Sequence, residues 1–75
     1  MDKVDFLDQM KELLEREKKV LFDDLFRSYE EWDSLAYLSV VAFIDEKYHV
    51  IIPFEIFRDF TTIGDIFEYV QHNKR

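Results

Sequence analysis

The spacing of apolar residues predicts a first helix of about 12–15 residues near the start of the chain. From Phe6 to Leu14, apolar positions recur at i, i+1, i+4, i+7 and i+8, while charged residues occupy the other faces. Asp2 or Asp5 can supply the acidic cap at its start. The helical pattern ends around residues 17–19.

Residues 20–33 read VLFDDLFRSYEEWD, with apolar clusters that follow no sustained period. We predict a long loop here, with a single turn of helix near Asp23. Loops longer than about 12 residues are uncommon in compact domains, and many of them are functional.

A second helix is predicted from Asp33 and Ser34 to about Tyr48. Its apolar residues cover more than one face, which is typical of a central helix in a small bundle. The residues of this helix that we expect in the core are Leu38, Val41, Ile44 and Tyr48.

The rest of the chain predicts a connector and two further helices. Residues 50–52 are an apolar run with no second strand to pair with, so we expect an extended connector whose side chains enter the core. Pro53 suits the start of a short third helix. The aromatic residues expected to face inward there are Phe54, Phe57 and Phe60. The Thr62-x-x-Asp65 pattern predicts the start of the last helix. The predicted fold is all-α: one domain over residues 1–75, with three main helices, a short third helix and a long first loop.

Composition narrows the function. The 75 residues carry a net charge of −7 and contain no cysteine, which excludes disulfides, thiolate zinc sites and a cysteine nucleophile. The excess of acidic residues argues against binding of nucleic acid, whose backbone is negatively charged, and indicates a basic partner. The first ten residues contain three Asp, unlike a signal or transit peptide, and the longest apolar run is five residues, far too short for a membrane span. We expect a cytoplasmic monomer that contacts no membrane and holds no metal.

Ser34 is the strongest candidate for chemistry. It follows Asp33 at the predicted start of the second helix, where the long loop ends. A helix N-terminus has unpaired N–H groups and a partial positive charge, so it accommodates a phosphate well. The alternative is that Asp33 or Ser34 only caps the helix. A serine hydrolase is not supported, because Ser34 lacks a G-x-S-x-G turn.

The order of features from Trp32-Asp33-Ser34-Leu35 through Pro53 to Thr62 resembles the acyl carrier protein and peptidyl carrier protein family, over about residues 20–72. In that family an Asp-Ser-Leu motif opens the second helix, and its serine carries 4′-phosphopantetheine. The resemblance implies a four-helix carrier-protein bundle with the cofactor attached to Ser34, between Asp33 and Leu35. It also implies that the chain is no enzyme, because the cofactor's thiol would hold a substrate as a thioester for other enzymes.

The resemblance implies three kinds of partner: a phosphopantetheinyl transferase, a ligase that loads an acyl or aminoacyl group, and downstream pathway enzymes. Glu31 and Trp32 precede the motif where fatty-acid carriers commonly have small residues, and Ala36 and Ser39 stand where acids are frequent. These departures favour a carrier of a specialised biosynthetic pathway, with a housekeeping fatty-acid carrier as the alternative. An unmodified helical interaction module is the alternative of a different class.

Six residues are candidates for partner binding: Glu31, Trp32, Leu35, Ala42, Asp45 and Glu46. For the charged ones the alternative is a solvated surface without a partner, because charged residues are mostly exposed in any case. For Leu35 the alternative is the core. For Trp32 we favour burial over a position beside the cofactor, because large aromatic side chains favour apolar contacts.

Overall fold

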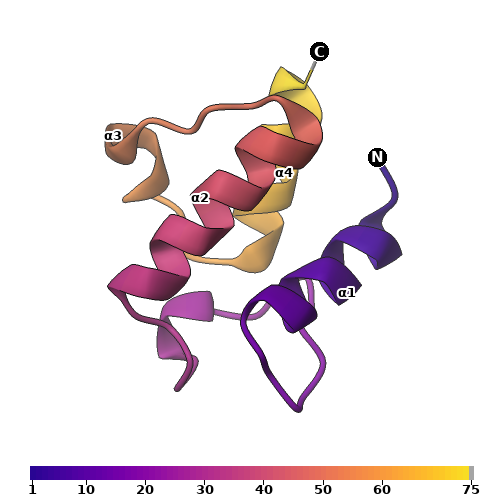
Figure 1. Cartoon of the computed structure of the whole chain (residues 1–75), viewed down its shortest axis with the longest axis vertical. Helices are drawn as coiled ribbons and strands as arrows, with labels where there is room; N and C mark the ends of the chain where they lie inside the picture. Colours follow the sequence, from indigo (N-terminus) through magenta and orange to yellow (C-terminus); the bar gives the residue numbers. More distant parts are fainter. Residues whose placement is uncertain (75) are drawn as a thin grey trace.

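The computed structural model describes residues 1–74, which form helices joined by loops and contain no strand within that range (Figure 1). In chain order the elements are α1 (Lys3–Leu13), the 3₁₀ helix η1 (Phe26–Ser28), α2 (Ser34–Tyr48), α3 (Phe54–Phe57) and α4 (Ile63–Asn73). Figure 1 shows α2 crossing the middle of the molecule, with α4 behind it and α1 to one side. The predicted all-α fold, with three main helices and a short third one, is confirmed.

Helix α1 begins at Asp2, one of the two predicted caps, whose Oδ1 accepts a hydrogen bond from the backbone N–H of Val4 at 2.9 Å. Phe6, Met10 and Leu14 line its buried side. The helix has 11 residues, so it is slightly shorter than the predicted 12–15.

The first loop is anchored to the start of α4. A turn of helix was predicted near Asp23, but residues 22–23 form a non-helical turn, and the single turn of helix is η1 at Phe26–Ser28, in which Phe26 is completely buried. The N–H of Gly64 donates to the carbonyl of Phe22 at 2.7 Å, and the N–H of Ile63 donates to that of Asp24 at 3.0 Å. These bonds hold the loop in one path although it has little regular structure.

Helix α2 has the predicted bounds, and Val40 and Ile44 are its fully buried residues. Of the four residues expected in the core, Ile44 is buried, Val41 and Tyr48 are partly buried, and Leu38 is 59% exposed. The prediction for Leu38 is wrong. Each helical residue advances by about 100°, so Leu38, two positions before Val40, points to the far side of the helix.

The connector after α2 is extended, and its residues alternate between the core and the solvent. Val50 and Ile52 are buried as expected, whereas Ile51 points outward. Pro53 is the N-cap of α3, and Phe57 at the end of that helix is buried. Phe54 is exposed, contrary to prediction, because α3 is a single turn at the edge of the bundle and only its last residue reaches the core.

Helix α4 begins with the predicted cap. The Oγ1 of Thr62 accepts from the N–H of Asp65 at 3.1 Å, and the Asp65 carboxylate accepts from the N–H of Thr62 at the same distance. The helix brings Phe67 against Phe6, with ring centroids 5.4 Å apart. Within residues 1–74, no helix is long and apolar enough to cross a membrane.

Candidate functional site

Ser34 is the first residue of α2, and its side chain is exposed. Asp33 is the N-cap, and its Oδ1 accepts a hydrogen bond from the N–H of Ala36 at 2.8 Å. Capping is therefore done by Asp33, and the hydroxyl of Ser34 is available for other chemistry.

Beside Ser34 lies a groove of about 380 Å³ between the start of α2 and α3. We call it the Ser34 groove. Its lining residues are Arg27, Trp32, Asp33, Ser34, Tyr37, Phe54, Phe57 and Arg58. It joins three segments that are distant in sequence: η1, the start of α2, and α3 with the residue after it.

Aromatic side chains form the apolar part of the Ser34 groove. Trp32 stacks on Phe57 with ring centroids 6.1 Å apart and planes 4° apart, and it meets Phe26 edge-on at 4.7 Å. Tyr37 meets Phe57 edge-on at 4.9 Å and Phe54 at 6.4 Å. Trp32 is thus partly buried, and it both packs on the core and lines the groove.

Arg27 connects η1 to the end of α3. Its Nη2 donates to the carbonyls of Phe57 at 3.0 Å and Arg58 at 3.4 Å, and its Nε donates to that of Phe60 at 3.2 Å. The last carbonyls of a helix have no intrahelical partner, and this guanidinium supplies one to Phe57, the last residue of α3. Arg27 therefore fixes one wall of the Ser34 groove.

Arg58, the other arginine of the groove, is exposed, and its guanidinium makes no hydrogen bond or ion pair with any side chain or backbone group of residues 1–74. The lining carries two guanidinium groups and one carboxylate, that of Asp33. The groove is positively charged in a chain whose net charge is −7.

Most of the candidate partner-binding residues share one exposed face of α2. Leu35 is 72% exposed, and Leu38, one turn further, continues the same face. We call this the α2 face: Leu35, Leu38, Ala42, Asp45 and Glu46, all exposed. Leu35 thus lies in solvent next to Ser34 rather than in the core.

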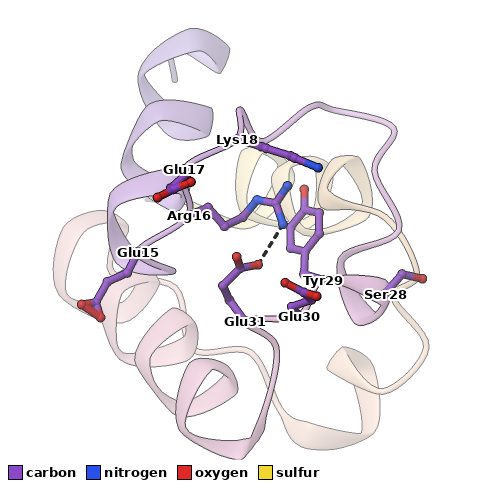
Figure 2. A pocket seen from close by; sticks show the side chains of 8 residues that line it. All are labelled: Glu15, Arg16, Glu17, Lys18, Ser28, Tyr29, Glu30 and Glu31. Carbon is purple, nitrogen blue, oxygen red and sulfur yellow. Dashed lines mark hydrogen bonds and ion pairs between the residues drawn. The ribbon is translucent and has the colours of Figure 1, made fainter.

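Glu31 lies away from the α2 face, beside a second hollow of about 690 Å³ (Figure 2). The residues that line this hollow are Glu15, Arg16, Glu17, Lys18, Ser28, Tyr29, Glu30 and Glu31. Figure 2 shows Arg16 running beside the ring of Tyr29 with its tip directed at Glu31, while Glu15 points away.

The Arg16 guanidinium carbon lies 3.6 Å from the centroid of the Tyr29 ring, and Nη1 lies 2.9 Å from Oε1 of Glu31. The Tyr29 hydroxyl donates to Oδ2 of Asp24 at 2.7 Å. Burial, together with the Asp24 carboxylate, holds the pKa of Tyr29 well above its ordinary value, so the hydroxyl stays protonated as a donor. This cluster ties the first loop to the segment that precedes Asp33.

Among residues 1–74, no three His, Asp or Glu side chains converge so as to hold a metal ion. The sequence did not reveal the groove arginines, Arg27 and Arg58. Each is an isolated basic residue, and nothing near it in sequence indicates that it faces Ser34.

Comparison with known proteins adds no relative: no family model matches the chain, and no curated protein matches it. The features of the molecule that bear on function are Ser34, the Ser34 groove and the α2 face.

Proposed function

We propose that this chain is an acyl or aminoacyl carrier protein in which Ser34 receives 4′-phosphopantetheine. The observation that carries the proposal is the exposed hydroxyl of Ser34 at the first residue of α2, released from capping by Asp33 and bordered by a positively charged groove. The resemblance of the Asp33-Ser34-Leu35 motif and the following elements to carrier proteins supports the same conclusion.

The residues around Ser34 fit the cofactor. In the transfer, Ser34 Oγ forms a bond to the β-phosphorus of coenzyme A as the bond to adenosine 3′,5′-bisphosphate breaks. The hydroxyl proton leaves to a base of the transferase. The resulting phosphodiester bears one negative charge, which suits the N-terminus of α2 and the two guanidinium groups of the groove. The cofactor supplies the thiol that this cysteine-free chain lacks.

The partners of the proposed carrier are a phosphopantetheinyl transferase, a ligase that loads the cargo, and the enzymes that use it. The α2 face offers them exposed Leu35 and Leu38 next to Ser34, followed by Asp45 and Glu46. Apolar contacts near the attachment point and acids further along suit a partner surface with an apolar centre and a basic rim. We propose that it meets these enzymes in the cytoplasm as a monomer.

The bulky Trp32 before the motif favours a specialised pathway over housekeeping fatty-acid synthesis. The Trp32 ring packs against Phe26 and Phe57. A large side chain is thus part of the packing at the position where fatty-acid carriers commonly have a small residue. A second candidate function is an unmodified interaction module, which the exposed apolar part of the α2 face favours, because that surface could bind a partner without any cofactor.

Intact mass measurement separates the two candidates. The chain is incubated with coenzyme A, Mg²⁺ and a transferase of broad specificity, with Ser39→Ala as the matched control for Ser34→Ala. The carrier proposal requires a gain of one phosphopantetheinyl group in the wild type and in Ser39→Ala, and none in Ser34→Ala. No gain with several transferases would favour the interaction module.

A further inference from the structure

The Ser34 groove differs in charge from the rest of the chain. Its lining bears Arg27 and Arg58 against the single carboxylate of Asp33, while the whole chain has seven more acids than bases. A positive hollow on an acidic protein is suited to a negatively charged group. Many ligands carry a negative charge, so the class of ligand has to be inferred from the other residues that line the groove.

The two arginines have different roles. Arg27 uses Nε and Nη2 on three backbone carbonyls around the end of α3, so it is occupied by the fold. The guanidinium of Arg58 is exposed and has no partner in the part of the chain that the structure describes. A free guanidinium presents a planar set of donors that matches two oxygens of a phosphate.

The remaining wall of the groove is apolar and open. Phe54 is 59% exposed at the groove rim, with its ring edge-on to Tyr37. Both rings line the groove, and an exposed phenylalanine gains free energy when apolar atoms cover it. The groove therefore combines one free cation with a small aromatic surface within reach of Ser34.

We infer that the Ser34 groove binds the first part of the phosphopantetheine arm: the Arg58 guanidinium pairs with the phosphodiester, and the two geminal methyl groups of the pantoyl unit pack against Phe54 and Tyr37. This inference rests on the proposed function. The arm is then held along α3 at its attached end, and only its distal part, which bears the thiol, moves freely.

The first experiment uses the chain loaded with phosphopantetheine, with loading verified by intact mass. The proton chemical shifts of the two pantoyl methyl groups are compared with those of free phosphopantetheine. Packing against aromatic rings moves these signals upfield, and the ³¹P signal of the phosphodiester shifts with them. Arg58→Gln and Phe54→Ala remove exposed side chains, so both variants keep the fold, and both are expected to return the methyl shifts toward the free values. Lys19→Gln, which removes an exposed charge outside the groove, should leave the shifts unchanged.

The second experiment needs no covalent loading. Free phosphopantetheine, pantetheine without phosphate and inorganic phosphate are each titrated into the unmodified chain, and the fluorescence of Trp32, the single tryptophan, reports on the groove that it lines. Phosphopantetheine should give a saturable change, and Arg58→Gln should weaken its binding about three- to tenfold. Binding of pantetheine should not depend on Arg58.

The outcomes separate this inference from the proposed function. If the chain loads but its pantoyl methyl shifts equal those of the free arm, the groove inference is wrong and the carrier proposal stands. If the chain does not load but binds phosphopantetheine in an Arg58-dependent way, the carrier proposal fails and the groove is a phosphopantetheine site. Absence of both loading and Trp32 response overturns both.

Discussion

Arg16 and Glu31 form an ion pair, 2.9 Å from Nη1 to Oε1, that joins the end of the α1 region to the segment leading into Ser34. The Arg16 side chain is only 11% exposed, and its Nε is buried with no hydrogen-bond partner within residues 1–74. Glu31 is therefore the charged group that compensates this buried cation, while the Tyr29 ring covers its face. The long first loop is closed by this contact.

Glu31→Ala should lower the free energy of unfolding by about 1–3 kcal/mol, because the guanidinium of Arg16 loses its partner and stays desolvated. Urea denaturation followed by circular dichroism measures the change. Glu30→Ala, which removes the neighbouring exposed acid, is the matched control and should change stability by less than about 0.5 kcal/mol. Equal effects of the two substitutions would mean that the pair contributes no more than an ordinary surface charge.

Phe67→Ala should destabilise the fold by about 3–5 kcal/mol, since Phe67 is buried between Phe6 and Phe22. A chain of this size has a net stability of only about 3–5 kcal/mol, so the variant should be largely unfolded in buffer. Phe54→Ala, which removes an exposed ring, is the control and should remain folded. A loss below about 1 kcal/mol for Phe67→Ala would contradict the packing of α4 described above.

Gly64 is a site where alanine should be harmful although it lies in a helix. A Cβ on Gly64 would lie 2.6 Å from Cε2 of Phe22, and the ring would have to leave its contact with Phe67. We expect Gly64→Ala to destabilise by about 1–2 kcal/mol, because the steric cost exceeds the gain in helix propensity.

The sign should reverse when Phe22 is also shortened. Phe22→Ala removes the three atoms nearest to a Cβ at residue 64, so in that background Gly64→Ala should stabilise by about 1 kcal/mol through helix propensity. Denaturation of the four chains in this cycle gives the coupling. The same sign in both backgrounds would exclude the Phe22 contact as the cause.

The free energy of unfolding should fall at acidic pH, because the folded chain stabilises the ionised carboxylate of Asp65. The N–H groups of Thr61 and Thr62 hold the pKa of its carboxyl below the ordinary value of about 3.9. The unfolded chain therefore binds the proton more readily, and the contribution of Asp65 is present above the unfolded pKa and lost as pH falls through the folded pKa.

Asp65→Asn should be less stable than the wild type at neutral pH by about 1 kcal/mol, and its stability should fall less steeply below about pH 4. Urea midpoints across a pH series test this, with Asp8→Asn, an exposed change on α1, as the control. If the wild type and Asp65→Asn had parallel profiles, the carboxylate would not be the group that titrates.

His49 ends α2 in the left-handed region, with φ of 59°. A side chain in this conformation costs roughly 1–2 kcal/mol, and glycine avoids most of that cost while adding some entropy to the unfolded chain. His49→Gly should thus raise stability by about 0.5–1 kcal/mol. Thermal unfolding should detect this increase, whereas His72→Gly, inside α4, should lower stability.

The elements could be predicted from the sequence where a local signal defines them. The caps at Asp33 and Thr62 act on N–H groups within three residues, so the starts of α2 and α4 could be located. The exposure of Leu38 and Phe54 could not be predicted. Each lies in a helix with apolar residues on more than one side, and the neighbouring elements decide which side is buried. The position of Ser34 as the first residue of α2 could be predicted, because Asp33 before it is a cap residue.

No local sequence pattern predicts the Ser34 groove, because its lining comes from three segments that are distant in sequence. Its arginines come from η1 and from the residue after α3, and the bond between them joins positions 31 apart. The pair of Arg16 and Glu31 likewise joins positions 15 apart. Contacts of this kind arise only when the loop folds against the helices.

The three carbonyls held by Arg27 make the first loop and α3 a single mechanical unit. Displacement of η1 would break the bonds that secure the end of α3, so a force applied to the first loop also acts on the wall of the Ser34 groove.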